Sequence, residues 1–453
     1  MHPLPSSYRD NTGFVFEQGG KIYRFIHTAY ANDYDLLMQS GLNDELVAKG
    51  WMVPHTEIKD WEEFDLPSGK ILLPEQLPFI SYPYEWSFSM WQDAALLTLG
   101  VAIASLNKGM SLKDATPFNV QFFRDGPIFI DTLSFEAYHE NKPWVAYRQF
   151  CECFLGPLLL MQYCHPESHK LFAVYPNGIP LNVLVSLLPK KTRWRLDVYL
   201  HIYLQARLTK KGNRKNPAVT HFSKKKLLLL LEGLTRLVTK LGVKKMCSAW
   251  ENYYSDTILG GDYLEKKTTL VRSFMEDIEF ERIIDLGANE GLFSLLLQDS
   301  AKNIIALDAD EQCIDALYNK IKSEKIRNIL PLVINLVTPS PAIGWNNSER
   351  DSITGRLKAD LVMALALVHH LAIANNIPLL MIADWLKPMG KYLLVEFIPK
   401  EDEKVQLLLQ NREDIFVDYT LPAFKSEFSR HYDILKEETV ANTQRVLFLM
   451  KNK

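Results

Sequence analysis

Cysteine is scarce in this sequence, and long hydrophobic runs are missing. The 453 residues include five cysteines, a small and odd number that argues against a framework of disulfide bonds. No apolar run approaches the roughly 20 residues that cross a bilayer, and Met1 to Pro5 lack the basic and apolar regions of a secretory signal. We therefore expect a soluble cytoplasmic protein without a membrane span.

Low-complexity tracts and clear internal repeats are also absent. Hydrophobic residues make up 47% of the chain and charged residues 23%, as in globular proteins. The length exceeds the range of a single core, so at least two domains are expected. Cys151, Cys153 and Cys164, which precedes His165, fall in an apolar helical pattern, where positions i and i+2 face apart. They indicate buried thiols, and we expect no metal site there.

A buried strand, a glycine turn and a helix are predicted at residues 283–298. Gly287 permits a sharp turn after the strand, and Gly291 allows close approach of a ligand where the helix begins. A second strand ends in Asp308, which follows Asp285 at about the spacing at which an acid reaches ribose hydroxyls in doubly wound sheets. Loop geometry alone would explain a lone glycine turn, but the acid after the second strand favours a cofactor site.

The nicotinamide fingerprint GxGxxG is missing, which disfavours hydride transfer. The pattern D-x-G-x-N-x-G, formed by Asp285, Gly287, Asn289 and Gly291 and followed by Asp308, resembles the class I S-adenosylmethionine-dependent methyltransferases. Their D/E-x-G-x-G-x-G turn holds the methionine part of the cofactor. A second stretch is similar to the fourth strand and following helix of many such enzymes, namely residues 359–371, ADLVMALALVHHL.

This resemblance covers about residues 270–453 and implies an α/β domain with a seven-stranded Rossmann-like sheet. Strands are expected at residues 282–286, 303–307, 329–334, 360–365, 391–397, 432–435 and 445–450. Helices are expected at residues 311–323, 370–386 and 404–411, covering both faces of the sheet. Ligands should gather at the carboxyl ends of the strands.

The resemblance also implies roles for individual residues in binding S-adenosyl-L-methionine. Asp285 and Gly287, within the turn that Asn289 and Gly291 complete, would hold the methionine part. Asp308 would bind the ribose, and Asn335, where an acid is more usual, would reach the adenine. Four aromatic residues ahead of the first strand could cover the cofactor, although packing explains them equally well: Trp250, Tyr253, Tyr254 and Tyr263.

Methyl transfer needs alignment of donor and nucleophile, and it needs a base only when the acceptor must lose a proton. His369 and His370, just beyond the fourth strand, and Glu396, at the end of the fifth, are the catalytic candidates. A histidine pair at a helix start can equally cap or pack. The polar insertion at residues 345–356 is a candidate for contact with the substrate.

A second motif lies in the N-terminal part. Asp114 and Asn119 stand in the D-x-x-x-x-N relation of a kinase catalytic loop, and Asp131 ends the next strand, where a metal-binding Asp would sit. The stretch resembles protein kinases and aminoglycoside phosphotransferases, which implies an α+β kinase-like domain over residues 1–188 and a site for ATP and magnesium. No full glycine-rich loop and no V-A-I-K lysine are present, so Arg24 or Lys21 would have to serve. Alternatively, the polar residues only organise a loop through hydrogen bonds.

Local patterns within residues 1–188 predict a hairpin from strands at 13–16 and 21–26 and helices at 34–49 and 87–108. A basic helical linker is expected over residues 189–269. Residues 190–245 carry 16 Lys and Arg against Asp197 and Glu232, although the whole chain has a net charge of −3. An anionic partner is conceivable. The leucine stripe at residues 227–241 instead favours a packed helix with a solvated basic face, and nucleic acid is not the favoured partner.

These patterns together predict a methyltransferase acting on a small-molecule or carrier-bound acceptor, with the kinase-like domain positioning the substrate. Two alternatives stay open: a bifunctional methyltransferase-kinase, and a nucleic-acid or carrier-binding scaffold that has lost methylation. The acceptor and the oligomeric state do not follow from the sequence.

Overall fold

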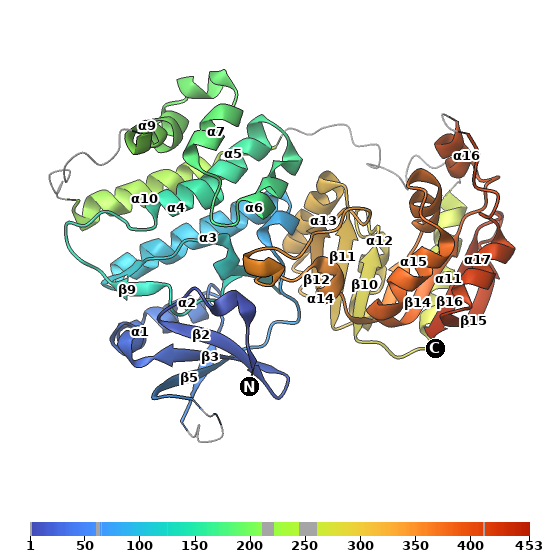
Figure 1. Cartoon of the computed structure of the whole chain (residues 1–453), viewed down its shortest axis with the longest axis horizontal. Helices are drawn as coiled ribbons and strands as arrows, with labels where there is room; N and C mark the ends of the chain where they lie inside the picture. The colour runs from blue at the N-terminus through green and yellow to red at the C-terminus, as the bar shows by residue number, and fades with distance from the viewer. Residues whose placement is uncertain are drawn as a thin grey trace. The chain divides into compact units, whose positions relative to one another are not determined.

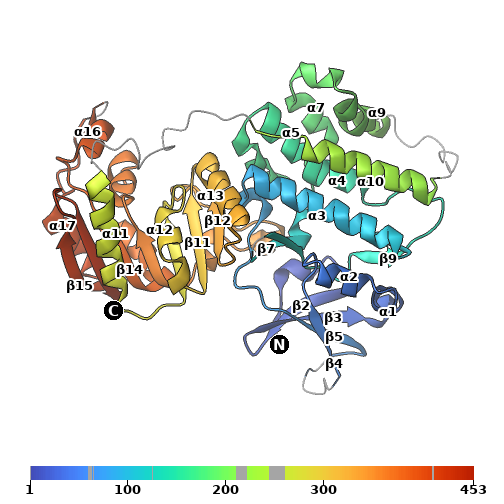
Figure 2. The ribbon, with the colours of Figure 1, turned by 180° about the vertical axis from the view of Figure 1, so that it is seen from behind.

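The computed structural model describes the whole chain except residues 1, 60–63, 65, 125, 211–221, 244–260 and 411–412. Contacts between residues divide the chain into two compact units, which are shown in Figures 1 and 2. The first comprises residues 1–245 and 342–351, and the second residues 246–341 and 352–453. This division differs from the expected boundaries after residues 188 and 269, because the described residues between 189 and 243 fall in the first unit. Trp250, Tyr253 and Tyr254 lie outside the described residues.

The first unit begins with an antiparallel sheet in the strand order β1-β2-β3-β5-β4. The expected hairpin is β2 and β3, joined through Gly19 and Gly20, which have φ of 59° and 73°. The helix expected at residues 34–49 is two helices, α1 and α2, because Gly41 adopts a φ of 69° between them. Their bounds are β1 His2–Pro3, β2 Gly13–Gln18, β3 Lys21–His27, β4 His55–Ile58, β5 Gly69–Pro74, α1 Ala31–Gln39 and α2 Leu42–Ala48.

A helical layer around α3 (Phe88–Asn107) forms the rest of the first unit (Figure 1). Helix α10 (Lys224–Thr239) packs on α3 through its buried leucines, and Gln92 Nε2 donates to the carbonyl oxygens of Val238 and Leu241 at 2.8 and 2.9 Å. The other strands form two small two-stranded sheets, β6 Met110–Leu112 with β9 Phe135–Ala137 and β7 Val120–Phe123 with β8 Gly126–Phe129. The other helices are α4 Tyr147–Phe150, α5 Gly156–Tyr163, α6 Leu171–Val174, α7 Leu181–Leu187, α8 Leu196–Val198 and α9 Leu204–Lys210.

Among the described helices, α3 alone is long and apolar enough to pass for a membrane span by length and composition. From the sequence, no apolar segment of this length was expected. Within its most apolar 18-residue window, 67% is buried in the structure, and α3 contacts α10, β6 and β8. Its apolar residues therefore serve the core of the first unit.

The second unit is built on a seven-stranded sheet in the order β12-β11-β10-β13-β14-β16-β15. The first five of these strands are parallel, and β16 pairs antiparallel with β14 and β15. A strand lies at each of the seven expected places: β10 Arg282–Leu286, β11 Asn303–Asp308, β12 Ile329–Val333, β13 Ala359–Ala364, β14 Gly390–Phe397, β15 Tyr432–Thr439 and β16 Val446–Asn452. The strand order reverses between β10 and β13. Open α/β sheets bind ligands at such a reversal, in the crevice outside the carboxyl ends of the strands.

Helices complete the second unit: α11 Gly261–Met275, α12 Leu292–Leu296, α13 Glu311–Glu324, α14 Ile353–Arg356, α15 Leu379–Leu386, α16 Glu403–Leu409 and α17 Leu421–Phe428. The expected helix 311–323 is α13, which the Asp310 carboxylate caps by accepting from the backbone of Gln312 and Cys313. The helix expected at residues 370–386 is instead a π-helical turn, His370–Ala374, followed by α15. Asn376 has a φ of 57° and Pro378 precedes α15, so the helix cannot continue through them.

Residues 342–351 interrupt the second unit in sequence and fold as part of the first. Glu349 Oε1 accepts hydrogen bonds from Tyr8 Oη and Arg9 Nη2, both at 2.7 Å. Although burial would raise it, these hydrogen bonds lower the pKa of Glu349 to about 2. The Arg350 guanidinium stacks on Phe118, with Cζ 4.4 Å from the ring centroid. Much of the polar insertion expected to contact a substrate is thus held by the first unit.

Candidate active site

The glycine turn after β10 has the conformation that its residue types favour. Gly287, Asn289 and Gly291 all have positive φ, at 75°, 52° and 75°, and Asn is among the residues that tolerate this region. The backbone N–H of Gly287 donates to the Leu307 carbonyl of β11 at 2.8 Å. A Cβ on Gly291 would lie 2.6 Å from Leu317 Cδ1. The turn is therefore fixed between two strand ends, and glycine at position 291 is required by close packing.

Asp308, the last residue of β11, faces this turn. Its Oδ2 accepts from the Asn289 backbone N–H and its Oδ1 from that of Asp310, both at 2.8 Å. Burial raises the pKa of Asp308 above its usual value, while these backbone donors oppose the rise. The two carboxylate oxygens have four lone pairs, and the backbone donors, among them the Ala309 N–H, do not occupy all of them. The carboxylate is thus oriented and keeps acceptor capacity for a vicinal diol such as a ribose.

Asp285 lies deeper in the turn and is 3% exposed. Its Oδ2 accepts from Ser294 Oγ on α12 at 2.7 Å. Burial raises the pKa of Asp285 to about 6, which the Ser294 hydrogen bond partly offsets. Asp285 therefore ties the end of β10 to the helix that follows the turn.

Asn335 follows β12 at the same edge of the sheet. Its Oδ1 accepts from the backbone N–H of Val337 at 2.9 Å and of Thr338 at 3.4 Å. The side-chain amide nitrogen makes no hydrogen bond with any residue that the structure describes, so a donor remains for a ligand. Contact with adenine through this group stays a prediction.

Glu396, at the end of β14, lies in a buried network. Lys267 Nζ of α11 is 2.6 Å from its Oε2, and Tyr263 Oη of α11 donates to Oε1 at 3.0 Å. The backbone N–H of Ala366, a residue with a φ of 51°, also donates to Oε2 at 2.9 Å. Burial alone would raise the pKa of Glu396, but the charges of Lys267 and Arg445 lower it below its usual value. Surrounded by donors, Glu396 is better placed to hold the turn after β13 than to take a proton from an acceptor.

Arg445 extends this network across the second unit. Its Nη1 donates to Tyr263 Oη at 2.9 Å, and its Nε lies 2.8 Å from Asp402 Oδ2. Tyr263 was predicted from the sequence as a residue near the cofactor, whereas Lys267 and Arg445 were not predicted as site residues. Lys267 falls in the polar run Glu265-Lys266-Lys267, which looks solvent-exposed, and Arg445 is far away in sequence. No local spacing marks either residue.

His369 and His370 begin the turn after β13, and their ring centroids lie 4.1 Å apart. The His369 side chain is fully buried, and neither ring nitrogen has a hydrogen-bond partner in the described part of the chain. Burial, followed by the charge of His370, lowers the pKa of His369 well below its usual value, and burial lowers that of His370 to about 4. Both imidazoles are therefore neutral at pH 7, and their burial makes each of them a weaker base than an exposed histidine.

The kinase-like motif residues of the first unit do come together, but they are occupied by internal partners. Arg24 of β3 lies 2.5 Å from Asp131, which also accepts from Ser134 Oγ. Asn119 Nδ2 donates to Asp114 Oδ2 at 3.2 Å.

Gln149 Nε2 donates to the other oxygen of Asp114 at 2.5 Å. Burial, followed by the charge of Asp131, raises the pKa of Asp114. The described residues contain no group of three or more metal-ligating side chains. Arg24, which was expected to serve for the missing lysine, is the cation that stands beside Asp131. Binding of ATP and magnesium by these residues stays a prediction.

No family model matches the sequence. The nodulation protein NoeA of Rhizobium meliloti (strain 1021) is 32% identical to it over 456 residues, which cover 98% of this chain and 95% of that protein. Among solved structures, the N-methyltransferase NodS from Bradyrhizobium japonicum WM9 is 12% identical and covers 42% of this chain and 97% of its own, with a TM-score of 0.32.

The bifunctional kinase-methyltransferase WbdD is 16% identical and covers 48% of this chain and 46% of its own, with a TM-score of 0.29. Both structural similarities are too weak to carry a functional argument.

Proposed function

The chain belongs to the family of the nodulation protein NoeA, and on that premise we propose that it is an S-adenosylmethionine-dependent methyltransferase. The second unit would hold the methyl donor and carry out the transfer. Its acceptor would be a small molecule or a carrier-bound group, and the first unit would position it.

The observation that carries this proposal is the pairing of the glycine turn with Asp308 beside the reversal of strand order. The turn brings backbone N–H groups close to the carboxyl end of β10, and the Asp308 carboxylate keeps acceptor capacity for ribose hydroxyls. This arrangement fits the residue pattern that resembles the class I methyltransferases. We propose that Asp308 binds the ribose, that the turn from Asp285 to Gly291 holds the methionine part, and that Asn335 reaches the adenine.

Bound in this crevice, S-adenosylmethionine would supply an electrophilic methyl group and depart as a neutral thioether. The protein would align the acceptor, exclude water and receive the proton that the acceptor loses as its bond to the methyl carbon forms. His369 would receive that proton, because one nitrogen of its neutral imidazole is unprotonated and neither nitrogen has a hydrogen-bond partner among the described residues. Glu396 and Lys267 would hold the Ala366 turn from which His369 follows.

A non-catalytic scaffold is the second candidate, and it is motivated by the basic segment at residues 190–245. Cofactor binding separates the two functions, because a scaffold need not bind S-adenosylmethionine. A bifunctional kinase is not proposed, since Asp131 is already paired with Arg24.

Calorimetric titration with S-adenosylmethionine and S-adenosylhomocysteine tests the proposal. Asp308→Asn should weaken binding by about 1.5 to 3 kcal/mol, because a charged acceptor of ribose hydroxyls is lost. Asp299→Asn, on an exposed turn of the same unit, removes the same charge and should leave affinity unchanged. Absence of binding by the wild type, or equal affinities in folded wild type and Asp308→Asn, would overturn the assigned site.

A second arm of this experiment addresses His369. Transfer from methyl-labelled S-adenosylmethionine into extract of cells lacking the protein should fall strongly in His369→Asn, while cofactor affinity stays within about twofold of the wild type. Unchanged transfer would remove His369 from the reaction and leave the cofactor site standing.

A further inference from the structure

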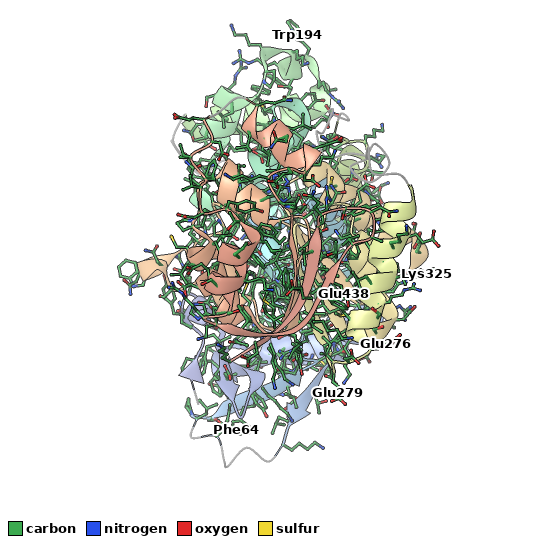
Figure 3. All side chains as sticks on the ribbon, turned by 90° about the vertical axis from the view of Figure 1, so that its right-hand side faces the viewer. Phe64, Trp194, Glu276, Glu279, Lys325 and Glu438 are labelled. Carbon is green, nitrogen blue, oxygen red and sulfur yellow. The ribbon has the colours of Figure 1, made fainter. Side chains whose placement is uncertain are left out.

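A tip of the first unit, residues Leu187–Leu200, exposes large apolar side chains. Trp194 is 91% exposed and Leu196 71%, with Leu187 and Leu200 also exposed. Figure 3 labels Trp194 at the outer edge of that view. By contrast, Trp86 and Trp91 of the same unit are fully buried. Exposed apolar clusters of this kind commonly mark interaction surfaces.

Cationic residues alternate with these apolar residues along the tip. Lys190, Lys191 and Arg193 are all exposed, and none of them forms an ion pair with another described residue. The acidic residue of the tip, Asp197, is neutralised by Arg195, whose Nη2 lies 2.9 Å from Asp197 Oδ2. The exposed charge of the tip is therefore positive.

The backbone of the tip is anchored, so its side chains are presented in a fixed arrangement. Thr192 is 1% exposed, and its Oγ1 lies 2.8 Å from the Pro189 carbonyl oxygen and 2.7 Å from Tyr203 Oη. Arg195 Nη1 donates to Tyr163 Oη on α5 at 2.7 Å. Thr192 and Val198 face inward while Trp194 and Leu196 face solvent. The exposure of Trp194 is thus a property of the folded tip and does not result from fraying.

We propose that this tip docks on the surface of an anionic phospholipid bilayer, with Trp194 and Leu196 at the level between headgroups and acyl chains and Lys190, Lys191 and Arg193 on headgroup phosphates. Tryptophan favours that interfacial level. Basic residues add attraction to anionic lipids, and binding grows with the apolar area inserted. This inference is independent of methyl transfer.

Nucleic acid suits the tip less well, although its charge is the same. Single-stranded nucleic acid binds through several aromatic side chains on which successive bases stack, whereas the exposed apolar groups here are one tryptophan and aliphatic leucines. Aliphatic side chains gain more from an acyl boundary than from a base.

Flotation of the full-length protein with vesicles tests the proposal. Wild type should float with vesicles of phosphatidylcholine mixed with phosphatidylglycerol and not with phosphatidylcholine alone, and salt should weaken binding. Lys190→Gln with Lys191→Gln should lower affinity about fivefold per residue. Trp194→Ser with Leu196→Ser should lower it at least as much, and all four positions are exposed, so the fold should persist.

Matched variants control for general charge and exposure. Lys320→Gln with Lys325→Gln removes two exposed charges from the second unit. Trp345→Ser removes a tryptophan that is 73% exposed and whose neighbouring cation, Arg9, is paired with Glu349. Both should bind vesicles as the wild type does. The proposal is overturned if the wild type ignores anionic vesicles, if the tip variants bind as well as the wild type, or if the control variants lose as much affinity. Salt-resistant binding to RNA without vesicle binding would overturn it in favour of a nucleic-acid surface.

Discussion

Single residues of the cofactor turn differ in what they contribute to the fold and to binding. Asp308 is held by two backbone donors and still has acceptor capacity, whereas Asp285 is enclosed and spends its accepting capacity on Ser294. A buried carboxylate with one hydroxyl partner resists ionisation, which is why burial raises the pKa of Asp285 to about 6. The consequence is a pH dependence of stability that belongs to Asp285.

The pKa of Asp285 is higher in the folded chain than the ordinary value of 3.8. Between about pH 4 and 6 the folded state therefore binds a proton that the unfolded state releases, and stability falls as pH rises through this window. The difference in unfolding free energy between wild type and Asp285→Asn should change by about 2 kcal/mol from pH 4 to pH 7. This difference is measured at each pH by denaturation that is monitored through hydrogen exchange of peptides from residues 282–308. A difference that is constant with pH would show that Asp285 titrates normally.

At the scale of elements, α11 is fastened to β14 by a buried ion pair. Lys267 and Glu396 are each at most 1% exposed, and their charged atoms lie 2.6 Å apart. Glu396 also accepts from the Ala366 backbone, so the pair connects a helix, a strand and the turn after β13. Removing one member of such a pair leaves an uncompensated buried charge, which costs more than the pair itself contributes.

Lys267→Met should therefore destabilise the second unit by about 3 to 5 kcal/mol. Lys267→Met combined with Glu396→Gln should recover part of that loss, because the orphaned charge is gone while the side-chain amide carbonyl introduced at position 396 can still accept from Ala366. Hydrogen exchange of peptides from β14 during urea denaturation provides the free energies for the double-mutant cycle. Additive losses would mean that the two side chains are not coupled.

Elements whose pattern is local were predictable from the sequence. The strands of the second unit are short apolar runs bounded by turn residues, and Gly287 and Gly291 mark the turn because side chains are strained or excluded there. The prediction of one helix at residues 370–386 was wrong. The apolar pattern continues through this range, but Asn376 and Pro378 interrupt the helical backbone. Lys267 and Arg445 could not be found, since their carboxylate partners lie 129 and 43 residues away in sequence.

At the scale of the whole chain, packing overrides composition. The basic charge of residues 190–245 predicted a separate linker, yet the buried leucines of α10 pack on α3 and join this segment to the first unit. Residues 342–351 likewise belong to the first unit although the residues before and after them belong to the second. Glu349 accepts hydrogen bonds there from Arg9 and Tyr8. Charge patterns report on solvent-facing side chains, whereas unit boundaries depend on which apolar faces meet.

The kinase-like carboxylates of the first unit should not be needed for methyl transfer in the second unit. Asp114 and Asp131 have internal donors from Gln149, Asn119 and Arg24, and nothing in their surroundings calls for magnesium. We therefore expect that magnesium-ATP will not shift the thermal unfolding of the wild type. We also expect that Asp114→Asn with Asp131→Asn will lower the stability of the first unit, because Arg24 loses its carboxylate.

Methyl transfer per folded molecule should stay within about twofold of the wild type in this double variant, because the group proposed to take the proton, His369, belongs to the second unit. Transfer of a labelled methyl group into cell extract measures this, with Asp308→Asn as the variant that must lose activity in the same assay. Loss of transfer in a folded double variant with normal cofactor affinity would show that the first unit takes part in the reaction. Saturable stabilisation of the wild type by magnesium-ATP would contradict the expectation that these carboxylates do not bind the metal.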